Sequence, residues 1–293
     1  MKARDRSARI LVLTLALAAG SALIAGCGGD DDSSEPSSIA VEASGGKGSL
    51  EVTAPSEAEA GPAEITFTNS SEEGELDGQL VYVAEGEDHT DMEVSAELGK
   101  AVEGQPVADW FQAAGGPGFA GKGESSTATV DLQAGTYYFV PSTDDEPTLP
   151  LTKFTVTGES DEDLPDADAT VTANEYSFSS EGLKAGETSV LLENAGAQWH
   201  HFLASPLKED ATIEQAREFL ETEKGEPPFV EQGPGQGAGA NEVESTVLEG
   251  GVSEVVDLDL LPGRYAFFCF IADKEGGPPH VAKGMVSEVE VTE

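Results

Sequence analysis

The amino-acid sequence predicts an all-β protein with two tandem β-sandwich domains, each carrying a short inserted helix. Short runs of alternating apolar and polar residues recur from residue 49 onward, with the period of half-buried strands. Gly, Pro and Asn separate these runs, as turns separate the strands of a sandwich. The succession of runs occurs twice, over 49–158 and again over 169–293, with the acidic linker 159–168 between them.

The first copy is expected to contain one helix among its strands. Thr90 and Glu93 have the spacing of a capping box, so the helix should begin there and continue to about Val102. The strands are expected at 50–53, 63–68, 79–84, 128–132, 136–140 and 153–157.

The second copy repeats this arrangement. Thr212 and Gln215 form another capping-box pattern, and the apolar residues after them repeat with a helical period to about Glu223. The strands are expected at 170–178, 187–193, 199–204, 253–260, 264–271 and 285–291.

The first 27 residues have the pattern of an export signal. A basic stretch precedes the apolar run 10–25, which is short for a membrane-spanning helix of about 20 apolar residues. The run ends at Leu-Ile-Ala-Gly-Cys27, which resembles the lipobox of bacterial lipoproteins. This resemblance implies lipidation of Cys27 and an extracytoplasmic protein anchored to the bacterial cell membrane. Residues 28–48 are mainly Gly, Ser and acidic residues, so we expect a flexible tether.

The chain is strongly acidic, with 56 acidic and 15 basic residues and a net charge of −41. Such a surface repels nucleic acid, so the composition excludes nucleic-acid binding. A redox partner recognised through charge should be a basic protein.

Three residue types near the C-terminus indicate a metal site. Cys269 follows an apolar, strand-like run, His280 follows a Gly/Pro-rich loop, and four residues separate His280 from Met285. Thiolate, imidazole and a weak thioether are ligands of a blue-copper site, which also needs a second histidine. His200 and His201 are the upstream candidates. Because neighbouring strand residues point to opposite faces, regular strand geometry allows only one of the two to reach the metal.

The cysteine count also favours a bound thiol. The chain has two cysteines, and lipidation of Cys27 leaves Cys269 without a disulfide partner in an exported protein. A lone thiol in an oxidising compartment is a liability unless it is buried or bound to a metal.

The second copy resembles the cupredoxins, the Greek-key β-sandwich family of plastocyanin and azurin. The shared motifs are an Asn-Ala-Gly turn shortly before a histidine, a Gly-x-Tyr-x-Phe-x-Cys strand, and a histidine separated from a methionine by four residues. The resemblance implies one type 1 copper ion with these ligands: His200, Cys269, His280 and Met285. It selects His200 as the upstream ligand, and it leaves His201 and Asn194 as supporting residues or alternative ligands.

The first copy keeps the strand pattern but lacks these ligands. The two copies can be aligned through their Gly-x-Tyr-x-Phe segments and, separately, through the ends of the earlier segments GQLVYVA and QWHHFLA. The aligned pairs are Pro141 with Cys269, Leu80 with His200 and Val81 with His201. We therefore expect the first copy to be a degenerate domain without a metal.

These inferences predict an exported, membrane-tethered protein that binds one copper ion and transfers single electrons. Two alternatives stay open: a copper-binding or copper-delivery module without electron transfer, and a metal-free cupredoxin-like interaction domain. We expect no enzymatic activity. Multicopper oxidases and copper nitrite reductases need further histidine-rich centres, and this chain has four histidines.

Overall fold

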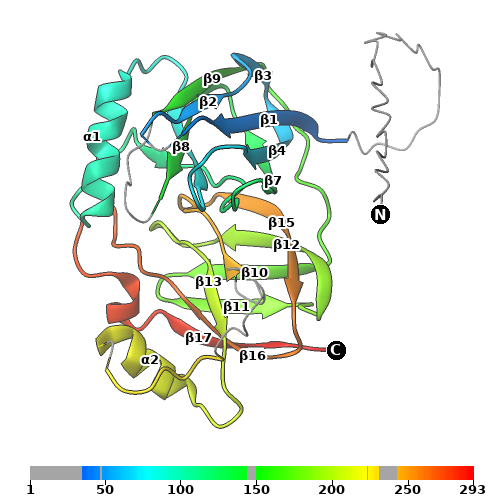
Figure 1. Ribbon diagram of the computed structural model, residues 1–293, viewed down its shortest axis with the longest axis vertical. Coiled ribbons are helices and arrows are strands. Elements are labelled where there is room, and N and C mark those ends of the chain that lie inside the picture. The colour runs from blue at the N-terminus through cyan, green and yellow to red at the C-terminus, as the bar shows by residue number, and fades with distance from the viewer. Residues whose placement is uncertain (1–34, 47, 144–149, 223, 231–242) are drawn as a thin grey trace, which may run out of the picture. The chain divides into compact units, whose positions relative to one another are not determined.

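Strands dominate the structure, a computed structural model that describes residues 35–46, 48–143, 150–222, 224–230 and 243–293. The described strands form three sheets, to which two α-helices and a short 3-10 helix are added (Figure 1). The predicted all-β class, with two tandem β-sandwiches and an inserted helix in each, is confirmed. The expected export signal, Cys27 and the first residues of the expected tether lie outside the described residues.

Each copy of the repeat contributes strands to two sheets. The first copy comprises β1 (Ser37–Ser44), β2 (Glu51–Thr53), β3 (Glu57–Glu59), β4 (Gly61–Asn69), β5 (Asp77–Ala84), α1 (Asp91–Val102), β6 (Gln112–Ala113), β7 (Ser125–Leu132), β8 (Gly135–Ser142) and β9 (Thr152–Thr157). The second comprises β10 (Ala169–Asn174), β11 (Ser177–Glu181), β12 (Gly186–Asn194), β13 (Leu203–Pro206), α2 (Ile213–Thr222), β14 (Val243–Glu244), β15 (Ser253–Leu260), β16 (Gly263–Phe268), the 3-10 helix η1 (His280–Lys283) and β17 (Val286–Val291).

One sheet is shared by the two copies. Its strand order is β11-β10-β12-β15-β7-β4-β1-β2, so the halves from the two copies join where β15 pairs with β7. A separate sheet closes each sandwich, β3-β9-β8-β5-β6 in the first copy and β14-β13-β16-β17 in the second. Each sandwich encloses an apolar core of its own. The strands that flank the predicted ligand loop, β16 and β17, are therefore neighbours in one small sheet.

The expected tether at 28–48 is wrong for residues 37–44, which form β1. Ile39, Val41 and Ala43 are buried and alternate with exposed residues, and β1 pairs in parallel with β4. The Ser- and Glu-rich composition conceals this short apolar alternation, and the ladder with β4 supplies the hydrogen bonds that hold it. The first sandwich therefore begins before residue 49.

Three predicted strands of the second copy differ from expectation at their ends. The stretch 170–178 is divided into β10 and β11 by a turn at Tyr176, whose φ is +63°. The stretch 199–204 is a strand only from Leu203 onward, and the stretch 264–271 ends as a strand at Phe268. Two predicted ligands, His200 and Cys269, consequently lie in loops beside strand ends.

Both inserted helices begin where the capping patterns predict. At α1, Thr90 Oγ1 accepts the Glu93 N–H at 3.2 Å and the Glu93 carboxylate accepts the Thr90 N–H at 2.8 Å. Thr212 and Gln215 make the same reciprocal pair at α2, at 3.3 and 2.8 Å. These bonds satisfy backbone donors that a first helical turn leaves free. No helix in the described part of the chain has the length and apolar character needed to cross a membrane.

Gln79 of β5 links the two copies through its side-chain amide. Its Oε1 accepts the Val247 N–H at 2.7 Å, and its Nε2 donates to the carbonyls of Val247 and Gly115, both at 3.1 Å. Val247 precedes Leu248, which forms a β-bridge with His200. The first copy thus supports the segment that borders a predicted metal ligand.

We expect Gln79→Ala to lower the free energy of unfolding by about 2 kcal/mol, because partly buried backbone groups would lose their partners. Equilibrium urea unfolding measures this change. Gln133→Ala is the matched control, since the Gln133 side chain is exposed, and its effect should stay within about 0.5 kcal/mol. Equal unfolding midpoints for the two variants would contradict the proposed link.

Candidate metal centre

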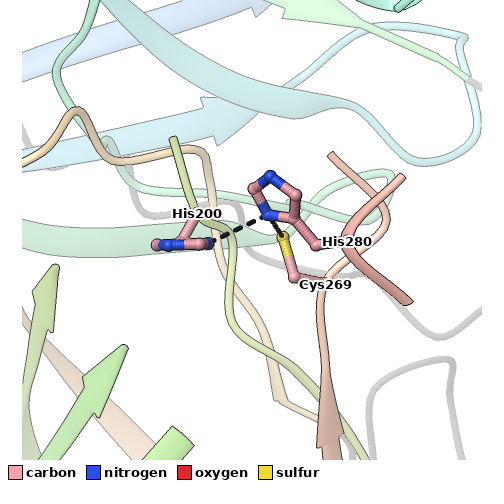
Figure 2. A group of neighbouring side chains, drawn as sticks. All are labelled: His200, Cys269 and His280. Atoms are coloured by element: carbon pink, nitrogen blue, oxygen red, sulfur yellow. Dashed lines mark hydrogen bonds between the residues drawn. The ribbon is translucent and has the colours of Figure 1, made fainter. Parts of the chain in front are cut away.

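His200, Cys269 and His280 form a cluster of metal-ligating side chains, and all three residues are completely buried. Their nearest ligand atoms lie within 4.8 Å of one another. Cys269 Sγ is 3.4 Å from His280 Nδ1, and His280 Nδ1 is 3.1 Å from His200 Nδ1. Figure 2 shows the two imidazole rings and the sulfur gathered around this point. Within the described residues, no other group of three His, Cys, Asp or Glu side chains meets the same distance criterion.

The backbone positions two of these side chains from one loop. Cys269 directly follows β16, and His280 begins η1. The His280 N–H donates to the Ile271 carbonyl and the Val281 N–H donates to the Cys269 carbonyl, both at 2.9 Å. These two bonds fold the chain back on itself, so that residues eleven positions apart face each other.

His200 is held by a two-residue bridge and by Asn194. The His200 N–H donates to the Leu248 carbonyl at 3.1 Å, and the Leu248 N–H donates to the His200 carbonyl at 2.8 Å. The buried Asn194 side chain donates to the carbonyls of Gln198 and Leu248, at 2.8 and 2.9 Å. Asn194 therefore braces the loop that carries His200, which is a supporting position and not a ligand position.

The His201 side chain lies outside the cluster and contacts the loop that follows Cys269. Its Nε2 accepts the Phe270 N–H at 2.6 Å, next to Cys269. Strand alternation cannot separate His200 from His201, because neither residue lies in a regular strand. The difference comes from the bridge with Leu248, which aims His200 into the cluster and leaves His201 to tie its loop to Phe270.

Both clustered histidines are neutral at neutral pH. Burial, together with the neighbouring His280, lowers the pKa of His200 to about 4. Burial also lowers the pKa of His280, although Asp273 opposes this change. A neutral imidazole can offer a nitrogen lone pair to a metal ion, so the environment favours the ligating form of both rings.

The thiol of Cys269 is protonated in the absence of a cation. Burial raises its pKa to about 12, while backbone N–H groups of His201 and Ile271 lower it by hydrogen bonding to Sγ. Both donors would stabilise a thiolate, and a bound metal ion would replace the proton. Cys269 therefore needs a bound cation to become a thiolate at neutral pH, and its side chain is shielded from water.

Met285 is also completely buried, and it shares the apolar core of the second sandwich with Cys269. Its N–H donates to the His280 carbonyl at 2.9 Å, directly after Gly284, whose φ is +89°. The chemistry of the donor set, two imidazole Nδ1 atoms and one thiolate with a thioether in the same core, fits a single type 1 copper ion.

Asp273 is part of the site although the sequence did not point to it. Its carboxylate accepts a hydrogen bond from His280 Nε2 at 3.0 Å and another from the Tyr176 hydroxyl at 3.1 Å, and it forms an ion pair with Lys283. These ionic and hydrogen-bonding donors outweigh the effect of burial and hold the pKa of Asp273 below its ordinary value. Ten residues separate Cys269 from His280, and Asp273 is the only one of them that contacts a clustered histidine through a carboxylate.

The first copy packs over the ligand loop, defined as residues 270–279. The Val107 N–H donates to the Lys274 carbonyl at 3.0 Å, and the Gly277 N–H donates to the Gly104 carbonyl at 3.2 Å. These bonds fasten the ligand loop at two points. They hold the ten-residue ligand loop against the first copy.

The first copy places no ligand at the aligned positions. Leu80 and Val81 are buried apolar residues of β5, and Pro141 belongs to β8. Asn69 nevertheless repeats the brace made by Asn194, because its Nδ2 donates to the carbonyls of Gly74 and Ala120, both at 3.1 Å. The two copies therefore share a scaffold, and the second one alone presents the clustered donors described above.

No family model matches this sequence, and no curated protein matches it. Similar solved structures include reduced auracyanin from Roseiflexus castenholzii, with 20% identity and a TM-score of 0.27 over 42% of this chain and 95% of that one. Auracyanin A, a blue copper protein from Chloroflexus aurantiacus, has 18% identity and a TM-score of 0.28 over 41% of this chain and 99% of that one. The copper nitrite reductase from Nitrosomonas europaea has 12% identity and a TM-score of 0.23 over 88% of this chain and 95% of that one.

The fold is cupredoxin-like. The two sandwiches joined through one sheet and the His-Cys-His cluster at one end of the second sandwich agree with the resemblance seen in the sequence. The candidate metal site lies in the second copy, and the first copy packs over its ligand loop.

The expectation that the chain is not an enzyme is contradicted by the comparisons. Structures that align over 87–88% of the chain include copper nitrite reductase and multicopper oxidase, which are enzymes. The number of histidines in the chain is therefore not a sufficient reason to exclude enzymatic activity.

Proposed function

We propose that this protein binds one copper ion in its second cupredoxin-like copy and carries single electrons through it. The observation that carries this proposal is the convergence of His200 Nδ1, Cys269 Sγ and His280 Nδ1 in a completely buried cluster. A copper ion bound there supplies one-electron redox chemistry.

The residues of the site hold the donor atoms in place and exclude water. Asn194 braces the loop of His200, and the backbone N–H groups of His201 and Ile271 support the sulfur of Cys269. Preformed donors leave little to rearrange when the charge of the site changes, which favours rapid electron transfer.

Burial of the ligands favours electron transfer over copper delivery. A delivery site has to release its ion to another ligand, and an open loop would allow this. Here His200, Cys269 and His280 have no exposed surface, and the first copy is hydrogen-bonded to the ligand loop. We therefore place copper delivery second.

The proposal includes export and attachment to a membrane. The basic stretch, the apolar run 10–25 and Cys27 support a lipid-anchored protein outside the cytoplasm. The net charge of −41 supports a basic protein as redox partner.

Titration of the copper-free protein with Cu(II), followed by visible absorption and EPR, tests the function. We expect saturation at one equivalent, an intense visible band, narrow copper hyperfine splitting and reversible bleaching by a reductant. Stoichiometric binding without the intense band would favour copper handling. Absence of binding would leave a metal-free interaction domain and would refute the proposal.

The two upstream histidines should respond differently to substitution. We expect His201→Ala to retain the band and to weaken copper binding by about 10- to 100-fold, because His201 supports the ligand loop from outside the cluster. His200→Ala, the matched variant, should lose the type 1 spectrum. A competition titration with a Cu(I) chelator measures both affinities, and the reverse order of effects would contradict the assignment of His200.

A further inference from the structure

The two ring nitrogens of His280 have different neighbours, and Asp273 contacts one of them. Its Oδ1 lies 3.0 Å from His280 Nε2. The other nitrogen, Nδ1, faces Cys269 Sγ at 3.4 Å and His200 Nδ1 at 3.1 Å. One nitrogen of the ring therefore meets a carboxylate, and the other meets the donor cluster.

This division determines which nitrogen carries the proton. A neutral imidazole has one N–H, and an ionised carboxylate can only accept a hydrogen bond. The proton of His280 therefore sits on Nε2, where it is donated to Asp273. Nδ1 keeps its lone pair, which is the arrangement a metal ligand needs.

The carboxylate is itself clamped. The Tyr176 hydroxyl donates to Asp273 Oδ1 at 3.1 Å, Lys283 pairs with Asp273 Oδ2, and Lys283 Nζ also donates to the Tyr176 hydroxyl at 3.0 Å. Tyr176 additionally packs edge-on against the His280 ring, with 5.2 Å between the ring centroids. The positive φ of Tyr176, which is rare for a residue other than glycine, places this side chain in the turn between β10 and β11. Asp273 of the ligand loop, Tyr176 of the β10–β11 turn and Lys283 of η1 thus form one connected group, which we call the clamp.

We propose that Asp273 is a positioning residue that sets the tautomer and orientation of His280, and that Asp273 and Lys283 together adjust how strongly the site prefers one copper oxidation state over the other. The effect on the copper oxidation state rests on the proposed copper function. The effect on the tautomer and orientation of His280 concerns the chain alone.

The clamp predicts an unusual order of effects for two substitutions. In Asp273→Asn, the cation of Lys283 would attract the amide oxygen and turn the NH₂ group toward His280. The NH₂ group would then donate to Nε2, so the ring proton would move to Nδ1 and block the lone pair that faces the cluster. Asp273→Ala removes the acceptor without supplying a donor, so the ring keeps access to either tautomer.

We therefore expect copper affinity to fall by about 10- to 100-fold in Asp273→Ala and further in Asp273→Asn. A role limited to packing would give the reverse order, because asparagine matches the shape of aspartate. Competition titrations with a chelator measure both affinities. Equal affinities, or tighter binding by Asp273→Asn than by Asp273→Ala, would overturn the positioning role.

The copper-free protein gives an independent readout. Long-range ¹H–¹⁵N NMR distinguishes the two tautomers of His280, and we expect the Nε2–H form in the native protein and the Nδ1–H form in Asp273→Asn. An unchanged tautomer would overturn the assignment even if copper binding were weakened. If the native protein binds no copper, the proposed function fails, while this measurement still decides the role of Asp273.

The reduction potential tests the electrostatic half. A negative charge near the site favours the more highly charged oxidation state, and a positive charge opposes it. Asp273→Ala should therefore raise the potential and Lys283→Met should lower it, whereas the exposed Lys184→Met control should leave it unchanged. Shifts of the same sign in the Asp273 and Lys283 variants would overturn this part, because general damage to the clamp does not distinguish the two charges.

Discussion

We expect Cys269→Ser to abolish the intense visible band predicted for the copper-loaded protein and to widen its copper hyperfine splitting. The reason is that Sγ is the only thiolate in the buried cluster, and serine offers no comparable soft donor to copper. Anaerobic Cu(II) titrations followed by absorption and EPR measure the loss. Residual binding through the two histidines would show ordinary copper spectra.

Two controls separate the loss of a ligand from the loss of the fold. The copper-free Cys269→Ser protein should unfold within about 1 kcal/mol of the native protein, because a serine hydroxyl can still accept the N–H groups of His201 and Ile271. Met285→Leu should retain the band, since a thioether is a weak ligand for copper. A blue Cys269→Ser protein would refute the assignment of the thiolate.

Glu254 should make the folded protein less stable as the pH rises. It lies on β15 at the seam between the two copies and is completely buried. Its Oε2 accepts the Gly116 N–H at 2.9 Å, while Oε1 has no hydrogen-bond partner among the described residues. Burial raises its pKa to about 8, and the nearby Asp77, whose own pKa burial raises to about 7, adds to the effect.

The sign of this dependence follows from proton binding. Between about pH 4.5 and pH 8 the folded protein keeps Glu254 protonated, whereas the unfolded chain has released that proton. Unfolding then releases a proton, so a rising pH favours the unfolded state. The contribution is fully present below the unfolded pKa and is lost as the pH passes through the folded pKa. Its slope reaches about 1.4 kcal/mol per pH unit for one group.

We expect Glu254→Gln to flatten the pH dependence of the unfolding free energy by up to that slope between pH 5 and pH 8. Glutamine stays neutral and can still accept the Gly116 N–H. Glu181→Gln, on the exposed side of β11, is the matched control and should leave the slope unchanged. Parallel curves for native protein and Glu254→Gln, measured by urea unfolding at each pH, would contradict the burial of a neutral carboxyl group.

Much of the site could be predicted because its ligands carry chemistry that is visible in a sequence. Cys269, His280 and Met285 lie on one continuous stretch, His280 and Met285 have the spacing seen in the family, and the structure buries all three. The structure places His200 in the cluster and His201 outside it, a difference that strand alternation could not decide. The decisive contact is the bridge between His200 and Leu248, which are 48 residues apart.

Local patterns also predicted most of the fold. The two capping boxes and the alternating strands depend on neighbours within a few residues, so they are legible along the chain. Strand β1 was missed because it depends on a remote partner, β4, more than on its own composition. The division of 170–178 at Tyr176 was missed because nothing local marks a positive φ at a tyrosine.

The sequence by itself determined the all-β class, the duplication and the identity of the buried soft donors, because these depend on local periodicity and residue chemistry. The tertiary structure alone decided that one sheet runs through both copies, that Glu254 is buried at their seam and that Asp273 faces His280. The physical reason is that burial and hydrogen bonding between remote segments depend on which strands pair and where loops close. The sequence does not show whether a carboxylate is exposed to water or hydrogen-bonded to an imidazole. Only the fold distinguishes these two environments.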